Sequence, residues 1–533
     1  MAQKVLVCDK VAKEGVQILA RAADVDILDE PLPEQALCEK VAPYHALVVR
    51  SATKVTEPVI AAAAELRVIG RAGVGVDNID VAAATERGII VLNSPGGNAV
   101  AAAEHAIALM MALARNIAQA NQSMAAGEWR KSDFMGTEVY QKTLGIIGVG
   151  RIGALVAERA RGLGMLVLGC DPLLTSDRAA RLGVDKVELD ELLQRADFVT
   201  VHAAKTPETI KLISDRELGL MKASARLVNC ARGGIVDEAA LCRALQNGTI
   251  AGAALDVFET EPPGDTPLFA CDNLIATPHL GASTAEAQVN VAVDVAEQIV
   301  EVLGGGPPRT SVNMPPIAPE VLRSLRPYMG LAEQMGKMHA ELQPGAIIRV
   351  EMTYGGQLAE QATGPLSPAF LAGLLSPTLD QPVNLVNARL IARNRGIEIQ
   401  ERKVTGARDY GSLIVTEVTS QEQTTTAAGT VFGRAEPHIV ELDGYRIDIV
   451  PEGLTILIRH QDRPGLVGKV GTLLGDNEIN IAGMQVGRER MGGEAVMALS
   501  VDQCVTPELL ARIEEIDGIS SSVLVDFSRA NTS

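Results

Sequence analysis

Several features that define whole classes of protein are missing from this sequence of 533 residues. Excess positive charge is missing: the formal net charge is −18, which argues against a nucleic-acid-binding surface and against binding to anionic membranes. No apolar run is long enough to cross a membrane, and the first residues, MAQKVLVCDKVAKEG, predict a buried strand instead of a signal peptide. These absences indicate a globular cytoplasmic protein.

Paired cysteines are missing as well. The seven cysteines are scattered, odd in number and free of C-x-x-C pairs. That pattern predicts free thiols in a reducing compartment and no metal site. The chain is too long for one hydrophobic core, so three or four domains are expected.

The most informative motif that is present lies between two strand patterns. Gly148-Val-Gly150-Arg-Ile-Gly153 follows the apolar run LGIIG and opens a helical pattern, and the next apolar run ends in Asp171. Glycines followed by an acid about 20 residues later are the fingerprint of a dinucleotide site, although a purely structural turn is the alternative. Gly148 permits the tight turn, Gly150 lets the backbone approach a pyrophosphate, and Gly153 allows close helix packing. Asp171 would bind the adenosine ribose and repel a 2′-phosphate, which predicts NAD instead of NADP.

Strands and helices alternate through the first 303 residues. Residues 1–95 alternate short Val- and Ile-rich strands with helices, and a second such unit follows a long helix over 99–124 that Asn98 would cap. Strands that are apolar on both faces predict two doubly wound, parallel α/β units. If a last helix over 285–303 returns to the first unit, the chain crosses between the lobes twice, which suits a hinge. The Gly- and Pro-rich stretch 304–319 predicts a linker.

The remainder of the chain has a different character. Residues 317–450 mix helices with strands and predict an α+β unit with a hairpin that turns at Asp443-Gly444. Three arginines there would either bind an anion or form a solvated helix face: Arg389, Arg393 and Arg395. Residues 453–527 read strand–helix–strand–strand–helix–strand, which predicts a ferredoxin-like split βαβ fold.

Three polar residues in loops after strands of the second unit form a candidate reaction centre. A nicotinamide enzyme acting on a 2-hydroxy acid needs a cation for the carboxylate, a base of near-neutral pKa and an acid that orients this base. Arg232, His279 and Glu261 supply these in that order, although seven histidines and many acids offer other combinations. His105, on an apolar helix face, is expected in the core, and His202, after a strand, is expected to line the cofactor cleft.

Basic residues follow two strands of the first unit. Arg50-Ser51 and Arg71 come directly after apolar strand patterns, at ends that should face a cleft. A phosphate on the substrate would explain arginines at both places, and surface charge is the alternative. Trp129, the only tryptophan, stands beside Arg130 and Lys131 and would anchor a subunit contact or reach an adjacent site.

Four motifs in chain order, the glycine motif and three others, carry a family resemblance: GVGRIG, NCARGGIVDE, ALDVFETEPP and TPHLGAST. Together they resemble the D-isomer-specific 2-hydroxyacid dehydrogenases. VRSATKVT, GRAGVGVDNID and FMGTEVYQKTLG are similar to the long-form branch of this family that acts on 3-phospho-D-glycerate. The resemblance covers the whole chain. It implies a flavodoxin-like substrate-binding domain (1–98 and 286–314), an NAD-binding Rossmann domain (99–285), an intervening domain similar to allosteric substrate-binding domains (317–450) and a regulatory ACT domain (453–527).

The resemblance also implies site residues. It makes Arg232, Glu261 and His279 the catalytic set, with His279 as acid–base. The residues implied for the cofactor are Gly148, Gly150, Arg151, Ile152, Gly153, Asp171, Pro172, His202, Thr206, Pro207, Cys230, Ala231, Arg232, Asp256, His279, Gly281 and Ala282. Those implied for the substrate are Arg50, Ser51, Arg71, Val74, Gly75 and Asn98, with Arg130 and Lys131 from a neighbouring subunit. L-serine would bind between two ACT domains at His460, Asp462 and Asn480.

The implied activity is the NAD-dependent oxidation of 3-phospho-D-glycerate to 3-phosphooxypyruvate, the first step of L-serine biosynthesis. A homo-oligomer, either dimer or tetramer, with feedback inhibition by serine and a side activity that reduces 2-oxoglutarate to 2-hydroxyglutarate is expected with it. Three alternatives stay open: a glyoxylate or hydroxypyruvate reductase, a non-catalytic NADH sensor on the same fold, and a C-terminal domain that serves assembly alone.

Overall fold

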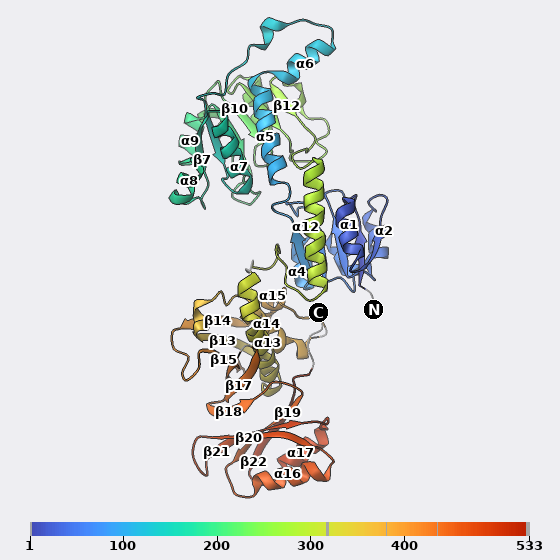
Figure 1. Cartoon of the computed structure of the whole chain (residues 1–533), viewed down its shortest axis with the longest axis vertical. Helices are drawn as coiled ribbons and strands as arrows, with labels where there is room; N and C mark the ends of the chain where they lie inside the picture. The colour runs from blue at the N-terminus through green and yellow to red at the C-terminus, as the bar shows by residue number, and fades with distance from the viewer. Residues whose placement is uncertain (1–2, 316–318, 380, 434, 529–533) are drawn as a thin grey trace.

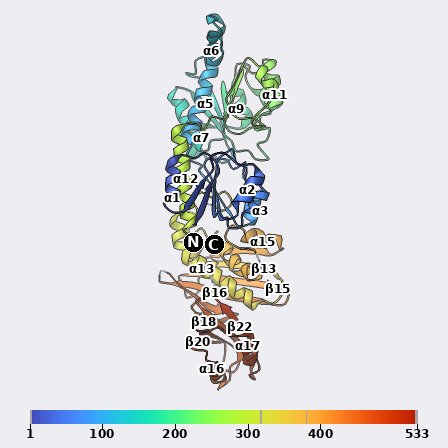
Figure 2. The ribbon, with the colours of Figure 1, turned by 90° about the vertical axis from the view of Figure 1, so that its right-hand side faces the viewer.

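The computed structural model describes residues 3–315, 319–379, 381–433 and 435–528. Four parts follow one another along its longest axis (Figure 1), and the same order is visible in the perpendicular view (Figure 2). From the top of Figure 1 these are the second lobe, the first lobe, the intervening domain and the C-terminal domain. The chain therefore reaches the most distant lobe and then returns past the first.

The first lobe is a five-stranded parallel sheet in the order β2-β1-β3-β4-β5. Its strands are β1 (Lys4–Val7), β2 (Asp24–Ile27), β3 (Ala46–Val49), β4 (Val68–Arg71) and β5 (Ile90–Asn93). Helices α2 (Glu34–Val41), α3 (Glu57–Ala62) and α4 (Val81–Glu86) cover one face, and α1 (Lys13–Ala20) and α12 (Ala285–Leu303) cover the other. Because α12 follows the second lobe in sequence, the chain crosses twice between the lobes. The predicted flavodoxin-like order is confirmed.

The second lobe is a seven-stranded parallel sheet in the order β12-β11-β10-β9-β6-β7-β8. Its strands are β6 (Thr143–Ile147), β7 (Leu166–Cys170), β8 (Asp185–Lys186), β9 (Phe198–Val201), β10 (Arg226–Asn229), β11 (Gly252–Leu255) and β12 (Leu274–Ala276). Helices α5 (Ala99–Ala114), α7 (Arg151–Gly162) and α8 (Ser176–Leu182) pack on one face, and α9 (Leu189–Arg195), α10 (Asp215–Leu220) and α11 (Glu238–Gln246) pack on the other. The strand order reverses between β6 and β9, which places a ligand crevice at the carboxyl ends of these two strands.

The helix predicted over 99–124 is interrupted. Asn116 adopts a left-handed conformation with φ of 51°, and the chain continues as α6 (Ile117–Ala125) at an angle of 66° to α5. The prediction of a single helix is wrong because the segment after α6 folds back onto the end of α5. There the amide of Thr137 donates a hydrogen bond to the carbonyl of Ala114 at 2.7 Å. Asn98 precedes α5 as expected, but its side chain makes no capping hydrogen bond.

A membrane-spanning helix needs both length and apolar composition. No single helix in the described ranges meets them, and the bent pair of α5 and α6 meets them only when its two members are combined.

The intervening domain is a mixed sheet in the order β14-β13-β15-β16-β17-β18. Its strands are β13 (Ile347–Gly356), β14 (Glu398–Val404), β15 (Ser412–Ser420), β16 (Thr424–Phe432), β17 (Glu436–Leu442) and β18 (Tyr445–Ile449). Its core is closed by α13 (Pro319–Leu342), α14 (Leu366–Leu375) and α15 (Ala388–Asn394). The predicted hairpin is confirmed, since Asp443 and Gly444 turn with φ of 49° and 82° between paired Leu442 and Tyr445.

The C-terminal domain is an antiparallel sheet in the order β20-β21-β19-β22 with two helices, as predicted. Its elements are β19 (Leu454–Gln461), α16 (Leu466–Asp476), β20 (Ile481–Arg488), β21 (Glu494–Val501), α17 (Pro507–Glu514) and β22 (Ile519–Asp526). Leu457, Val496 and Val525 join the apolar core of the intervening domain. The intervening and C-terminal domains are thus packed through one continuous core.

Hydrogen bonds also tie the intervening domain to the first lobe. Asn384 donates its side-chain amide to the carbonyl of Gly88 at 2.8 Å, and Asn387 donates to the carbonyl of Glu86 at 3.3 Å. Of the predicted linker, residues 316–318 lie outside the described residues, and Ser311 pairs with Leu92 beside β5. This part of the linker is therefore an edge of the first lobe.

Candidate active site

The glycine motif forms a tight turn between β6 and α7. Gly148 has a φ of 89°, and a Cβ there would lie 2.7 Å from the amide of Ala203. A Cβ on Gly153 would lie 2.2 Å from the carbonyl oxygen of Gly148, whereas one on Gly150 would meet no atom within 4 Å. The turn therefore needs Gly148 and Gly153 for its own packing. It leaves Gly150, at the start of α7, open to a ligand that binds the free amides of the first helical turn.

Asp171, at the end of β7, lies beside this turn. Its carboxylate accepts hydrogen bonds from the amides of Val149, at 2.8 Å, and Leu173, at 2.7 Å. The amide of Gly148 in turn bonds the carbonyl of Cys170 at 2.9 Å. The acid is thereby held at the place where a dinucleotide fingerprint puts the ribose.

Other residues predicted for the cofactor lie around the same edge of the sheet. His202 follows β9, and burial lowers the pKa of its imidazole to about 4, so the ring is neutral at neutral pH. Its Nε2 lies 2.9 Å from the hydroxyl of Thr200, and its buried Nδ1 has no partner. Cys230 follows β10, and burial raises the pKa of its thiol. Neither side chain is poised for proton transfer at neutral pH.

The remaining cofactor residues follow five strands of the second lobe, in the connecting loops or at the start of α7. Arg151, Ile152 and Pro172 follow β6 and β7; Thr206, Pro207 and Ala231 follow β9 and β10; Gly281 and Ala282 follow β12. The amide of Thr206 bonds the hydroxyl of Thr209 at 2.7 Å, which closes a local turn. All of these residues follow the carboxyl ends of parallel strands, so they share one edge of the sheet.

His279 and Glu261 lie together although 18 residues separate them. Nδ1 of His279 is 2.7 Å from Oε2 of Glu261, and the amide of Phe258 donates to the other carboxylate oxygen at 3.1 Å. The imidazole side chain is 47 % exposed, and Nδ1 is the ring nitrogen that contacts Glu261. The pair has the geometry of a base oriented by a carboxylate.

Asp256, predicted to contact the cofactor, has a different environment. Its side chain is 1 % exposed, and its carboxylate accepts hydrogen bonds from the amides of Leu280, at 2.7 Å, and Gly281, at 2.8 Å. The hydroxyl of Thr277 donates to it at 2.6 Å, and Nε2 of His105 lies 3.1 Å away. These hydrogen bonds outweigh burial and hold the pKa of Asp256 below its usual range. The expectation that His105 is simply a core residue is wrong, because its ring nitrogen faces a buried carboxylate.

Arg232 reaches from the second lobe to the first. Its Nε bonds Oδ2 of Asp77 at 3.2 Å, and its Nη1 donates to the carbonyl of Ala231 at 2.7 Å. A Cβ on Gly75 would lie 2.0 Å from Nη2 of Arg232, so a larger residue there would displace the guanidinium from its present position. The carboxylate of Asp77 shows that an acid group fits against Arg232 in the crevice.

Two more guanidinium groups of the first lobe lie near Arg232. Burial, and then the positive charges of Arg232 and Arg50, lower the pKa of Arg71 to about 10. Nε of Arg71 is buried without a partner, and the side chain lies across Gly73, where a Cβ would be 1.4 Å from its Nη1. Three cations that converge with an unsatisfied buried donor make a site for a polyanionic ligand.

Ser51 follows Arg50, Val74 lies three residues after Arg71, and Asn98 directly precedes α5. Val74 is fixed by the side chain of Asn93, which donates to its carbonyl at 2.6 Å, and Oδ1 of Asn98 is buried without a partner. Sequence reasoning missed Asp9 and Asn78. Asp9 accepts from the backbone amide of Arg50 and from the hydroxyl of Thr53, and Asn78 donates to the carbonyl of Arg50 at 2.6 Å. Their position after apolar strands was the available signal.

Arg130 and Lys131 are not brought to the crevice within one chain. They follow α6, which projects beyond the second lobe at the far end of the molecule (Figure 1). Arg130 instead bonds Asp133 at 2.9 Å and Glu128 at 3.4 Å. Trp129 and Met135 beside them are 78 % and 84 % exposed.

Of the three residues predicted for serine, Asn480 lies apart from His460 and Asp462. Asp462, after β19, accepts from Arg488 at 2.8 Å and from the amide of Gly492 at 3.2 Å; these bonds lower the pKa of Asp462. His460 is 2 % exposed, with Nε2 buried and unpartnered. Asn480 precedes β20 and bonds Asp502 at 2.6 Å, at the opposite end of this strand from Arg488. One chain does not assemble this set.

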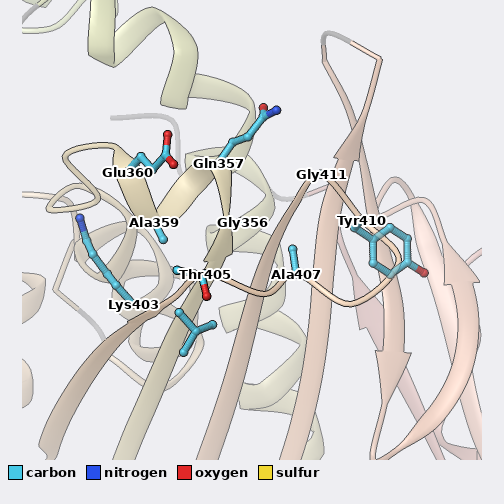
Figure 3. Close-up of a pocket in the computed structure, with 10 residues that line it drawn as sticks. Gly356, Gln357, Ala359, Glu360, Lys403, Thr405, Ala407, Tyr410 and Gly411 are labelled. Atoms are coloured by element: carbon cyan, nitrogen blue, oxygen red, sulfur yellow. The ribbon is translucent and has the colours of Figure 1, made fainter.

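The intervening domain contains a pocket of about 530 Å³ between η3 (Gln357–Glu360), the end of β14 and the loop before β15 (Figure 3). Lys403 lines it, but its ammonium donates to the carbonyl of Gln361 at 2.6 Å. Of the three arginines discussed there, Arg389 pairs with Glu401, while Arg393 and Arg395 are exposed. In residues 3–315, 319–379, 381–433 and 435–528, no group of three His, Cys, Asp or Glu side chains is placed to hold a metal ion.

Three known domain families together match most of the chain. Residues 107–281 match the NAD-binding domain of D-isomer specific 2-hydroxyacid dehydrogenases. Residues 324–443 match the intervening domain of D-3-phosphoglycerate dehydrogenase, and residues 454–518 match the ACT domain.

Individual proteins give the same picture. The chain is 48 % identical to D-3-phosphoglycerate dehydrogenase of Synechocystis sp., over 98 % of its own length and 94 % of that protein. It is 42 % identical to the enzyme of that name from Bacillus subtilis, over 98 % and 99 %. Among solved structures it is similar to a protein from Thermus thermophilus (34 % identity, TM-score 0.55) that covers 58 % of this chain and 100 % of its own. A glyoxylate reductase from Paecilomyes thermophila (31 %, TM-score 0.54) covers 58 % and 98 %.

Proposed function

The chain belongs to the D-3-phosphoglycerate dehydrogenase family, and on this premise we propose how its residues divide the work of the reaction. It is an NAD-dependent oxidoreductase of L-serine biosynthesis that oxidises 3-phospho-D-glycerate to 3-phosphooxypyruvate. The observation that carries the proposal is the 2.7 Å contact between Nδ1 of His279 and Oε2 of Glu261 in the second lobe.

His279 is the acid–base of the reaction. With Nδ1 held by Glu261, its Nε2 takes the proton of the C2 hydroxyl as the hydride leaves C2. When bound, the nicotinamide supplies the acceptor of that hydride. Glu261 fixes the orientation of the ring and stabilises its protonated form through a charge-assisted hydrogen bond. In the reverse direction His279 returns the proton to the carbonyl oxygen.

Arginines hold the two anionic ends of the substrate. Arg232 binds the carboxylate, in place of its present contact with Asp77, and Arg50 and Arg71 bind the phosphate. 2-Oxoglutarate also carries an anionic group at each end, which supports a side activity on this dicarboxylate. The phosphate cations come from the first lobe and the acid–base from the second, so closing the hinge assembles the site.

The residues at the glycine turn fit NAD. The pyrophosphate would bind the free amides at the start of α7, where the face of Gly150 is open, and Asp171 would accept hydrogen bonds from the adenosine ribose. Asp256 we assign to holding the loop after β12, because its carboxylate is already occupied by protein donors.

A glyoxylate or hydroxypyruvate reductase is the rival function. The similar glyoxylate reductase covers 58 % of the chain, and the rest is an intervening and an ACT domain. Such a reductase has no phosphate to bind, whereas Arg71 is buried here beside two other cations. Turnover that is higher with unphosphorylated hydroxypyruvate than with 3-phosphooxypyruvate would favour the rival.

Substitution His279→Ala tests the acid–base assignment. We expect kcat to fall by a factor of about 10² or more while NADH binding, followed by its fluorescence, stays within about twofold. The control is His438→Ala, because His438 lies in the intervening domain and pairs with Asp448. Near-normal turnover of His279→Ala would remove this residue from the chemistry, and no turnover of any 2-oxo acid by the unaltered protein would favour an NADH sensor.

A second copy of the chain is expected to cover the projecting segment around α6. Trp129 and Met135 are exposed there beside Arg130 and Lys131, so pairing would bury them and bring these cations toward a neighbouring crevice. Trp129→Ala should lower the molar mass measured by light scattering at micromolar concentration. Tyr140→Ala is the matched control, because Tyr140 is also an exposed aromatic residue, at 62 %, but lies off this segment. An unchanged mass for Trp129→Ala would contradict the interface.

Serine would bind between two ACT domains. Since Asp462 and Asn480 lie at opposite ends of β20, an antiparallel pair of C-terminal domains would bring the Asp462 of one near the Asn480 of the other.

All seven cysteines are unpaired, which supports a reducing compartment such as the cytoplasm.

A further inference from the structure

We infer that His105 is a positioning residue for the acid–base His279 and acts through the carboxylate of Asp256. The inference rests on the proposed role of His279, and it assigns a function to a histidine that touches neither substrate nor cofactor. His105 lies on α5, the helix with which the chain first enters the second lobe (Figure 1).

Hydrogen bonds to Asp256 hold the backbone of His279 and of the residues around it. The amide of His279 donates to the carbonyl of Asp256 at 2.9 Å. The hydroxyl of Thr277, two residues before His279, donates to the Asp256 carboxylate at 2.6 Å. The amides of Leu280 and Gly281, the two residues after His279, donate to the same carboxylate at 2.7 Å and 2.8 Å. Asp256 therefore fixes the loop on both sides of the acid–base.

That loop is held in an unfavourable conformation. His279 has a φ of 54°, a left-handed value that residues other than glycine seldom adopt. Such a conformation persists only where the surrounding structure over-determines it. Nearly half of the His279 side chain is exposed, so its direction is set by this backbone and by Glu261 rather than by tight packing.

His105 completes the hydrogen bonding of the carboxylate that holds the loop. Its Nε2 is 3.1 Å from Oδ1 of Asp256 and 3.3 Å from the hydroxyl of Thr277. Because an ionised carboxylate only accepts, Nε2 carries the hydrogen in this contact. The donor also comes from another element: α5 packs against β10 and β11, so His105 locks the carboxylate against the helix that enters the lobe.

Three variants on α5 test the inference. His105→Ala removes the donor, and His105→Gln restores it, because the amide nitrogen of glutamine extends to the position of Nε2. Glu104→Gln is the control, because Glu104 is the neighbouring residue and makes a surface ion pair with Arg159 at 3.0 Å. For each variant kcat, the KM for the phosphoglycerate substrate, NADH binding and thermal stability are measured on the full chain.

We expect His105→Ala to lower kcat by about tenfold or more, since small displacements of a reacting group have effects of this size, with KM and NADH binding within about twofold. His105→Gln should recover at least half of kcat, and Glu104→Gln should behave as the unaltered chain. If His105→Ala does not fold, His105→Asn replaces it, because the shorter asparagine amide does not reach Asp256.

Two results would overturn the inference. One is a kcat of His105→Ala within twofold of the unaltered chain. The other is a loss that His105→Gln does not repair and that affects kcat, KM and thermal stability together, which would make His105 a packing residue. His279→Ala, measured in parallel, separates this inference from its premise. If His279→Ala keeps its turnover, the proposed acid–base fails, whereas a dead His279→Ala beside an unaffected His105→Ala refutes the positioning role alone.

Discussion

Arg71 offers a test in which stability and activity should change in opposite directions. Its guanidinium is buried beside the positive charges of Arg232 and Arg50, and its Nε has no partner. Without substrate this buried cation destabilises the folded state, and with substrate it is expected to bind the phosphate. We therefore expect Arg71→Met, which keeps the length of the side chain but removes its charge, to stabilise the free protein and to impair the enzyme.

The pKa of Arg71 sets the size of the stability effect. It is lowered from 12.5 to about 10 by burial and then by the two neighbouring arginines. The unfolded chain thus binds the proton more tightly than the folded protein, so the destabilisation is complete below pH 10 and is relieved as the pH rises toward 12.5. A shift of this size corresponds to roughly 3 kcal/mol, which solvent screening reduces to about 1–2 kcal/mol.

The effect on activity follows from the lost phosphate contact. A charge-assisted hydrogen bond contributes about 1.5–3 kcal/mol, which corresponds to a fall in kcat/KM of roughly 10- to 100-fold. Since the contact exists in the ground state and in the transition state, the fall should be found mainly in KM.

Denaturant unfolding of the free protein and steady-state kinetics with the phosphoglycerate substrate measure the two effects. Arg67→Met is the matched control, because Arg67 directly precedes the same strand, β4, at the edge away from the crevice. It should leave KM unchanged. An Arg71→Met variant that is less stable than the unaltered free protein, or that retains a normal KM, would refute the reasoning.

Two further predictions concern the cofactor and the effector. Asp171→Asn should raise the KM for NAD and reduce the preference for NAD over NADP, because the repulsion of a 2′-phosphate is lost; an unchanged ratio of the two kcat/KM values contradicts the assignment. Calorimetry should detect heat when L-serine is added to the full chain and none with Asn480→Ala. Equal heats would remove Asn480 from the effector site, and no heat with the unaltered chain would leave assembly as the role of the C-terminal domain.

Local patterns in the sequence predicted much of the fold and part of the site. The glycine turn, Asp171 and the hairpin at Asp443 depend on the backbone conformations that neighbouring residues allow, so a few consecutive residues suffice to predict them. Most strands of both lobes were predictable because strands buried on both faces are apolar at nearly every position, whereas the exposed two-residue strand β8 was not predicted. The break between α5 and α6 was missed because it depends on Thr137, which returns to the carbonyl of Ala114.

The sequence by itself determined the element order, the turn chemistry and the residue types that could serve a reaction, because each of these depends on near neighbours in the chain. Only the tertiary structure decided which acids His105 and His279 meet. Glu261 pairs with His279, and Asp256, which was predicted to contact the cofactor, accepts hydrogen bonds from the loop of His279 and lies against His105. Such pairings follow from the way strand ends and α5 converge on one edge of a sheet. No local pattern encodes that convergence.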